Sequence, residues 1–396
     1  WRVRVRAAGA TDLHLGFAHF ALPDGATLHV IGADDAYQGP YIAADAADAS
    51  FNTPAIPGDT ATIELHLPTN AAFAPGMLQL SRVGVGFRDL FRREKSGDPG
   101  PGAAGPCNIN VACPLGQSYP NEISAVGYYE YVADDDHNSY LCSGTLLADV
   151  PRDRRNYFIT AAHCAGTPTE AASMVIYWNY QSTQCAALVA PAGGFFGDDL
   201  HGATLRATRA DVDFSLVELT QSPPTAWGPY YAGWDASGAQ PAATIGIHHP
   251  SGDVKKITAG PAPSTIASCV VNGPPDTHWM TGPYTQGTTE SGSSGSGLFI
   301  AAGNDSRARL LIGTLTGGDA ACSSMAPNQP NASTDCYGKF AVAWNGASSA
   351  SRLHDWLDPA STGTTTLQGG DISSAPVQAH STRAIPAILR DRSSHR

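Results

Sequence analysis

The chain has 396 residues, 42% of them apolar and 15% charged, which is enough to build a large core and more than one domain. Its 42 glycines and 29 prolines exclude a fold of long helices and favour short strands joined by turns. The net charge of -12 would repel a polyanion, so no nucleic acid is expected as a partner.

Eight cysteines lie between Cys107 and Cys336. An even number confined to one stretch predicts disulfides formed in an oxidising compartment, and so a secreted, extracellular protein. The numbering starts at Trp1 without a basic and apolar leader, so we expect a signal peptide to be absent from this chain. No run of eighteen apolar residues occurs, so no membrane is expected as a partner.

The first 95 residues are predicted to form a β-rich propeptide domain. Residues 1–6 alternate at period two, and further short runs are separated by turns such as Pro23-Asp-Gly and Pro57-Gly-Asp. This pattern predicts a small antiparallel sandwich. Residues 96–106 are rich in Gly and Pro and are expected to be an exposed linker with a processing site.

Residues 107–362 are predicted to form the second and larger domain. Its short apolar runs have the length of strands, at 122–131, 141–147, 157–162, 174–180, 214–219, 243–248, 298–301 and 310–315. One short helix is expected at 351–357. This arrangement favours a pair of β-barrels over a parallel α/β fold. Residues 363–396 have no apolar periodicity and are expected to be a flexible tail.

A histidine at the end of an apolar strand is the first candidate for chemistry. His163 lies in Thr160-Ala-Ala-His-Cys164, and Cys142 lies about one strand upstream. A single histidine is usually a surface or core residue. A bridge between Cys142 and Cys164 would, however, fix the strand end and hold the imidazole in the single rotamer that a general base needs.

A Ser/Gly run from Glu290 to Gly297 is the second candidate. Such runs are often linkers, but this one leads into the apolar residues 298–300. Its glycines can direct backbone N–H groups inward, as a tetrahedral oxyanion requires.

Asp213 opens an apolar strand and would be carried towards the interior, where a carboxylate needs a partner such as the N–H of an imidazole. Asp211 competes for this role, and most acids at such positions only cap a strand. The order His163, Asp213, Ser294 is the one used by serine hydrolases of the double β-barrel type.

Residues 102–363 closely resemble the secreted bacterial lysyl endopeptidases, a branch of the trypsin-like proteases. The segments that carry the resemblance are Cys107-Asn-Ile-Asn-Val-Ala-Cys113-Pro, Tyr177-Trp-Asn-Tyr-Gln181, Asp213-Phe-Ser-Leu-Val-Glu-Leu219, Gly246-Ile-His-His-Pro250 and Ser351-Arg-Leu-His-Asp-Trp-Leu-Asp-Pro-Ala-Ser-Thr-Gly363. The resemblance implies an all-β fold with a double six-stranded antiparallel β-barrel. It also implies a monomeric zymogen whose mature form cleaves proteins or peptides after a basic residue, without a metal or cofactor.

The resemblance assigns roles to named residues. His163 would be the general base, Asp213 its orienting acid and Ser294 the nucleophile that forms an acyl-enzyme. The N–H groups of Gly292 and Ser294 would form the oxyanion hole.

The resemblance also describes a pocket for a lysine side chain. Asp335 would bind the substrate ammonium, because Thr288 stands where trypsin has its specificity aspartate. Thr316 and Gly317 would line the pocket. Thr316 and Cys269 replace an aromatic pair of the family, which opens the alternative of a broader Arg/Lys specificity.

Three disulfides are implied by the resemblance, and the two remaining cysteines are expected to pair across the pocket wall. The expected pairs are Cys107–Cys322, Cys113–Cys185, Cys142–Cys164 and Cys269–Cys336.

Activation is expected to differ from that of trypsin. Ser293, not an aspartate, precedes the nucleophile, so a new α-amino group has no acid to pair with there. Propeptide removal should act by unblocking the site or by assisting folding. Lys95 is one of only four lysines and lies beside the predicted linker, so autocatalytic cleavage at Lys95-Ser96 is expected. A coding bias explains the scarcity of lysine equally well.

The sequence offers two further interpretations, a metal site at two adjacent histidines and a protein without catalytic activity. His248 and His249 are adjacent on a predicted strand and point to opposite faces, so core packing or a hydrogen bond is expected there rather than a metal site. A non-catalytic relative, with the barrels as a binding scaffold and the first ninety residues as an adhesive module, would not need an intact His163, Asp213 and Ser294.

Overall fold

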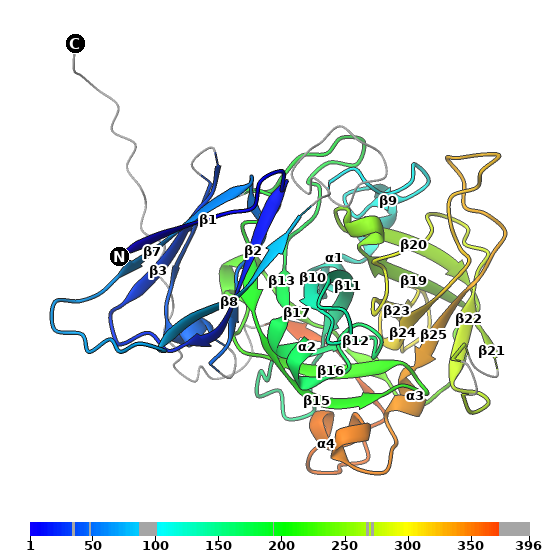
Figure 1. Cartoon of the computed structure of the whole chain (residues 1–396). Coiled ribbons are helices and arrows are strands. Elements are labelled where there is room, and N and C mark those ends of the chain that lie inside the picture. Colours follow the sequence, from blue (N-terminus) through cyan, green and yellow to red (C-terminus); the bar gives the residue numbers. More distant parts are fainter. Residues whose placement is uncertain are drawn as a thin grey trace.

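The computed structural model describes residues 1–33, 36–46, 49–86, 101–192, 194–266, 269–270 and 273–371 (Figure 1). Strands dominate these residues, and the longest α-helices span only six residues. No helix in the described part is long and apolar enough to cross a membrane. The processing site expected at Lys95-Ser96 lies outside the described residues.

The N-terminal part is a sandwich of two four-stranded sheets. The first sheet has the order β1-β7-β3-β4, at Arg2–Arg6, Thr60–His66, Thr27–Ile31 and Tyr37–Tyr41. In the second, β2 at Asp12–Phe20 pairs with β5, β6 and β8 at Phe51–Asn52, Ile56–Pro57 and Leu78–Val85. Leu13 and Leu15 of one sheet and Val30 and Ile63 of the other share one buried core.

A seven-stranded antiparallel sheet follows, shown in cyan to green in Figure 1. Its order is β14-β13-β10-β11-β12-β16-β15, at Asp199–His201, Val175–Tyr177, Val126–Val132, Ser139–Leu146, Tyr157–Thr160, Phe214–Leu219 and Ala203–Arg209. Helices α1 at Pro120–Ala125 and α2 at Pro168–Ser173 accompany it.

The last large sheet has ten strands, six of them with four or more residues. These six are β22, β25, β24, β23, β19 and β20, at His278–Thr281, Asp335–Lys339, Leu311–Gly318, Gly297–Ile300, Ala243–His248 and Lys256–Pro261. The short strands β21, β9, β18 and β26 lie at Ser264–Ile266, Ile109–Asn110, Trp234–Asp235 and Thr366–Leu367. Together the two large sheets give the all-β, chymotrypsin-like fold that was expected.

The remaining elements are short. A further pair joins β17 at Tyr230–Tyr231 to β27 at Gly370–Asp371. The other helices are α3 and α4 at Phe340–Ala343 and His354–Leu357, and the 3-10 turns η2 to η6 at Ala43–Asp45, Pro114–Ser118, Thr225–Trp227, Pro250–Gly252 and Ser349–Ser351.

Three local expectations need correction. The run at 122–131 begins as helix α1, because Pro120 suits the first helical turn, and becomes a strand only at Val126. The helix expected at 351–357 is divided between η6 and α4. Residues 366–371, expected to belong to a flexible tail, contribute the paired strands β26 and β27.

The sandwich packs against the edge of the seven-stranded sheet, as the blue and green strands show in Figure 1. His201 Nδ1 lies 2.9 Å from the carbonyl oxygen of Asn52, and the N–H of Ala55 donates to the Tyr177 hydroxyl over 3.3 Å. His14 of the sandwich lies between its own Asp12 and Glu130 of strand β10. The interface is therefore partly polar and contains ionisable groups from both sides.

Candidate active site

His163 and Asp213 form a two-point contact. The Nδ1 atom of His163 lies 2.8 Å from Asp213 Oδ2, and the backbone N–H of His163 donates to Asp213 Oδ1 over 3.0 Å. Asp213 is buried, whereas the His163 side chain is 44% exposed. The Asp213 carboxylate therefore orients the imidazole through Nδ1, and the ring is otherwise partly open to solvent.

Local backbone geometry brings these two residues together. Asp213 has a φ of 54°, a left-handed conformation that aspartate tolerates better than most residues, and it immediately precedes β16. His163 follows β12, which pairs with β16. The disulfide from Cys142 to Cys164 ties the chain beside His163 to β11. The strand pairing and the bridge together fix the imidazole.

The sulfur atoms of Cys142 and Cys164 also lie close to the ring of His163, in an arrangement that resembles a metal-binding cluster. Both sulfurs belong to one disulfide, so neither is available as the thiolate that a metal requires.

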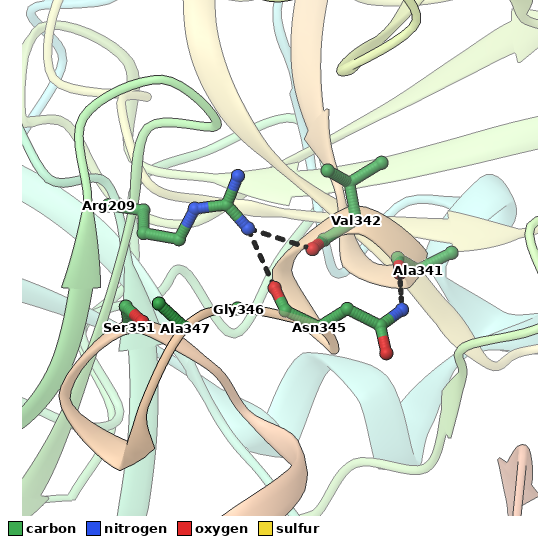
Figure 2. A pocket seen from close by; sticks show the side chains of 7 residues that line it. All are labelled: Arg209, Ala341, Val342, Asn345, Gly346, Ala347 and Ser351. Atoms are coloured by element: carbon green, nitrogen blue, oxygen red, sulfur yellow. Dashed lines mark hydrogen bonds between the residues drawn. The ribbon is translucent and has the colours of Figure 1, made fainter.

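The competing acid, Asp211, has a different partner. Arg209 holds it with two hydrogen bonds of 2.9 and 2.6 Å, and this hydrogen bonding lowers the pKa of the Asp211 carboxyl. Arg209 also donates to the carbonyls of Val342 and Asn345, as Figure 2 shows at a pocket of about 630 Å³. Asp211 therefore belongs to a link between β15 and the α3 region, and Asp213 faces the imidazole.

The loop that carries Ser294 contacts the strand end that carries His163. The N–H of Ser143 donates to the Ser294 carbonyl over 2.8 Å, and the Thr160 hydroxyl donates to the Ser143 carbonyl over 2.9 Å. A Cβ on Gly295 would lie only 2.1 Å from the Thr160 hydroxyl, so glycine is required there. The loop of Ser294 therefore packs against Thr160, which precedes His163 by three positions in the sequence.

Two backbone N–H groups of this loop, those of Gly292 and Ser294, donate to no acceptor within the described residues. The carbonyl of Ser291 shares a peptide group with the Gly292 N–H, and it accepts a hydrogen bond from the Ser251 N–H. The carbonyl of Ser293 shares a peptide group with the Ser294 N–H, and it accepts from the Ser296 N–H. In a trans peptide the N–H points opposite to its carbonyl. The two free donors are therefore held in position, as an oxyanion hole requires.

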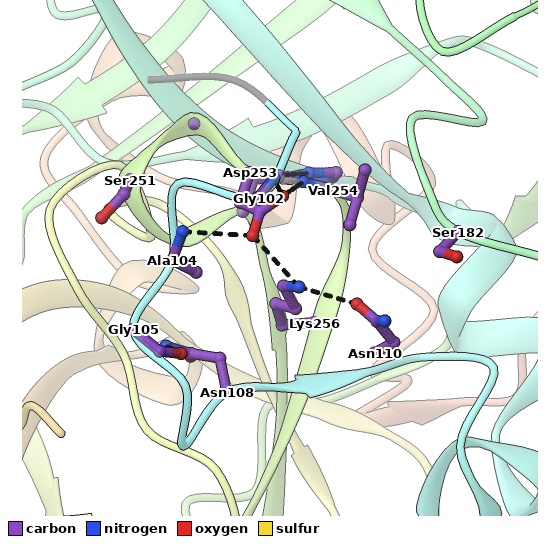
Figure 3. A network of polar contacts seen from close by, with 12 residues as sticks. Gly102, Ala104, Gly105, Asn108, Asn110, Ser182, Ser251, Asp253, Val254 and Lys256 are labelled. Atoms are coloured by element: carbon purple, nitrogen blue, oxygen red, sulfur yellow. Dashed lines mark hydrogen bonds and ion pairs between the residues drawn. The ribbon is translucent and has the colours of Figure 1, made fainter. Parts of the chain in front are cut away.

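The last residues of the predicted linker, together with Asn108 after it, support this loop by hydrogen bonds. Glu290 accepts hydrogen bonds from the Gly105 N–H, the Asn108 amide and the Ser251 hydroxyl, at 3.0, 2.9 and 2.7 Å. Beside it, the buried Asp253 accepts from the Gly102 N–H at 2.6 Å and pairs with Lys256 at 3.1 Å. Figure 3 shows the second part of this network around Asp253 and Lys256.

Asp335 lies on β25, and its side chain is enclosed by neutral donors. The hydroxyls of Tyr284 and Thr289 and the N–H of Ala320 all donate to it. Asp335 is only 1% exposed, and this burial raises the pKa of its carboxyl despite the hydrogen bonds that lower it. In the described part of the chain, no lysine or arginine pairs with Asp335.

The other expected pocket residues lie near this carboxylate. Thr288 is fully buried next to Thr289 in the chain. Thr316 sits in the bulge of β24, between the positions that pair with Tyr337 and Cys336. The hydroxyls of both Thr288 and Thr316 are buried without a hydrogen-bond partner in the described structure. Gly317 has a φ of 149°, beside the same bulge.

The structure contains four disulfides and no free cysteine. They join Cys107 to Cys322, Cys113 to Cys185, Cys142 to Cys164 and Cys269 to Cys336. The first three are the pairs implied by the family resemblance, and the fourth is the pair predicted for the two remaining cysteines. The fourth disulfide ties the residue after Asp335 to the chain before β22.

Comparison with known families decides the class of this enzyme. Residues 101–338 match the family model of the lysyl endopeptidase C-terminal domain, and residues 2–84 match that of the lysyl endopeptidase N-terminal domain. The chain belongs to the lysyl endopeptidase family. A lysyl endopeptidase of Pseudomonas aeruginosa is 34% identical to it over 327 residues, which cover 80% of this chain and 67% of that protein. As a member of this family, the chain is a trypsin-like serine endopeptidase.

Two solved structures also resemble this lysyl endopeptidase-family chain. The protease Anisep of Arthrobacter nicotinovorans is 14% identical, with a TM-score of 0.39, and the match covers 59% of this chain and 93% of that chain. A thermostable serine protease, AL20, from an extremophilic microorganism is 12% identical, with a TM-score of 0.36, and the match covers 56% and 93%.

Sequence reasoning missed the residues that support the loop of Ser294. Ser143 is fully buried and connects three parts of the site, since its hydroxyl accepts from the His249 N–H and donates to the Gly292 carbonyl. Glu290 binds Gly105 at the end of the predicted linker and Asn108 just after it. Glu290 opens the Ser/Gly run that the sequence indicates and Ser143 follows Cys142, but no residue type or spacing shows which distant backbone groups the two residues contact.

Proposed function

We propose that the enzyme hydrolyses peptide bonds with Ser294 as nucleophile, His163 as general base and Asp213 as the acid that orients the base. In this mechanism His163 Nε2 takes the proton of the Ser294 hydroxyl as its oxygen attacks the scissile carbonyl. The tetrahedral intermediate then collapses to an acyl-enzyme as His163 gives the proton to the leaving amine. Water releases the acid product by the same route in reverse.

The observation that carries this proposal is the geometry around His163. Its Nδ1 faces a buried carboxylate, which fixes the tautomer with a proton on Nδ1 and leaves Nε2 unprotonated and ready to accept. The unpaired N–H groups of Gly292 and Ser294 add the donors that the developing oxyanion needs.

For the substrate we propose a lysine before the scissile bond, with Asp335 as the partner of its ammonium group. The support is that Asp335 is buried and surrounded by hydroxyl donors, with no cation of the described chain beside it. A buried carboxylate without a cation strongly favours a substrate that supplies one, and an uncharged side chain would leave it unpaired.

The lysines of the enzyme itself agree with this proposal. Three of the four, Lys255, Lys256 and Lys339, are each no more than 8% exposed. A protease specific for lysine would not find an accessible site at any of them in the folded enzyme. Lys95 is the fourth, and we propose that cleavage at Lys95-Ser96 separates an N-terminal propeptide from an enzyme that acts outside the cell, where its disulfides are stable.

A broader specificity for both arginine and lysine is the second candidate. The observation in its favour is the unpartnered, buried hydroxyl of Thr316, since a guanidinium carries more donors than an ammonium and would use an additional acceptor.

Two experiments test the proposed function. Stoichiometric labelling by a serine-directed phosphonate, mapped to Ser294 by mass spectrometry, is expected; a chain that is not labelled would be a non-catalytic binding protein. Matched peptides that differ only in Lys or Arg before the scissile bond would then separate the two specificities. Equal kcat/KM values for both would favour the broader one.

A further inference from the structure

A buried histidine contacts the residue that precedes the nucleophile. His248 is fully buried at the end of β19, and its Nδ1 lies 2.8 Å from the hydroxyl oxygen of Ser293. The same hydroxyl oxygen accepts the N–H of Glu290 over 3.2 Å. Ser293 is itself fully buried, so this contact lies beneath the loop and away from solvent.

The hydrogen bond between His248 and Ser293 is one between two neutral groups. Burial, and the nearby Lys256, lower the pKa of His248 to about 3, so the imidazole is neutral and only one of its two nitrogens carries a proton. The Ser293 hydroxyl can donate its proton to Nδ1 or accept one from it, and it accepts the Glu290 N–H in both cases. Either tautomer of His248 therefore makes the contact.

The contact between His248 and Ser293 influences the orientation of the two proposed oxyanion donors, because Ser293 lies between them in the backbone. Ser293 lies between Gly292 and Ser294, and its N–H donates to the Glu290 carbonyl while its hydroxyl accepts the Glu290 N–H. This closes a tight turn from Glu290 to Ser293. A rotation of Ser293 would turn the Ser294 N–H away from its present direction.

We propose that His248 is a positioning residue for the oxyanion hole, and that it acts through the hydrogen bond between its Nδ1 and the Ser293 hydroxyl, which holds the Glu290–Ser294 turn. The proposal rests on the proposed function, because it supposes that the N–H groups of Gly292 and Ser294 stabilise the transition state. In trypsin-like enzymes with an aspartate before the nucleophile, an ion pair holds the oxyanion loop in place. In this chain we assign that role to the neutral hydrogen bond between His248 and Ser293.

The test compares three substitutions of one side chain. His248→Asn keeps a hydrogen-bonding amide close to the position of Nδ1, whereas His248→Gln places its amide near Nε2 and His248→Leu has no hydrogen-bonding group. We expect kcat to fall by about 10- to 100-fold in the Gln and Leu variants, and by less than about threefold in the Asn variant. KM should change by less than about threefold in all of them, because the lysine pocket is not touched.

A second readout separates positioning from general damage to the fold. When a peptide aldehyde ending in lysine binds, the Ser294 oxygen adds to the aldehyde carbon. The former aldehyde oxygen of this adduct then lies in the proposed oxyanion hole. The inhibition constant of the aldehyde should rise in parallel with the loss of kcat. Inhibition by n-butylamine, which fills only the lysine pocket, should stay unchanged. Far-UV circular dichroism and the melting temperature check that each variant folds.

The partner residue gives an independent check. Ser293→Ala should lower kcat to the same extent as His248→Leu, and the double variant should lose little more than either single one. Equal kcat values for the wild type and the folded Leu variant would overturn the inference. So would losses of kcat that multiply in the double variant. An inactive wild type, or an active Ser294→Ala variant, would instead overturn the proposed function.

Discussion

Two buried carboxylates lie in the same enzyme with opposite kinds of partner. Asp213 meets the imidazole of His163 at 2.8 Å, within its own chain. Asp335 is as deeply buried, but hydroxyl groups and one backbone N–H surround it, and burial raises the pKa of its carboxyl. The comparison teaches that one acid is paired with an ionisable side chain on folding, whereas the other is surrounded by neutral donors, as our proposal for a substrate cation at Asp335 requires.

The largest effect should come from removing the proposed nucleophile, Ser294. Ser294→Ala is expected to lower kcat by about 10⁶-fold, with KM nearly unchanged, because the acyl-enzyme can no longer form. Hydrolysis of a lysine anilide substrate measures it. Ser264→Ala, on the exposed strand β21, is the matched control and should keep full activity.

The next largest effect should come from the acid that is satisfied by folding. Asp213→Asn is expected to lower kcat by about 10⁴-fold, because an amide would stabilise the wrong tautomer of His163. The control is Asp211→Asn, which removes the charge that pairs with Arg209 and one of the two acceptors, and should change kcat less than about threefold. If the two variants lose activity equally, the assignment of Asp213 is wrong.

The other acid should reveal itself in the pH dependence of binding. Because the pKa of Asp335 is raised, its carboxyl gains a proton as the pH falls towards that pKa, and the ion pair with a substrate lysine is then lost. KM for a lysine peptide should therefore rise on acidification. Asp335→Asn should raise KM by about 10³-fold at neutral pH and abolish this dependence. A KM that stays independent of pH in the wild type would remove Asp335 from the pocket.

The smallest effect concerns a third buried acid, Glu130, whose partner is His14 of the N-terminal sandwich. Burial opposes the charge on His14, but Glu130 and Asp12 outweigh it and raise the pKa of His14. The stabilising contact is therefore present below the unfolded pKa of about 6.5 and is lost as the pH rises through the folded value. Burial also raises the pKa of Glu130, so the contact weakens again at acidic pH when Glu130 takes up a proton.

His14→Gln tests this interface contact. The melting temperature of the full chain should fall by about 2–4 °C at pH 5.5 and remain unchanged at pH 9. An equal fall at both pH values would mean that His14 contributes by packing and not by charge.

Much of this picture was accessible from the sequence, and the reasons are local. Apolar alternation predicts the strands, and the residue types around His163, Asp213 and Ser294 indicate the chemistry because each stands at a strand end. The residues alone left Asp211 open beside Asp213, and only the resemblance favoured Asp213. The sequence does not show that Arg209 holds Asp211, because Arg209 is itself positioned by residues more than a hundred positions away.

The supporting contacts of the loop could not be predicted for the same reason. A sequence shows that His248 is followed by His249, and that neighbouring strand residues face opposite sides. It does not show that His248 meets Ser293, because that contact depends on how β19 lies beneath the loop. Long-range polar contacts of this kind need coordinates, whereas short-range patterns of apolar residues do not.

The claim that Asp335 is reserved for a substrate cation is tested most directly by two peptides that differ in one group. One carries lysine before the scissile bond and the other carries norleucine, which lacks the ammonium and keeps the chain of methylene groups. At neutral pH we predict a kcat/KM at least about 10³-fold higher for the lysine peptide, because norleucine would leave a buried carboxylate unpaired. Equal values for the two peptides would contradict the account.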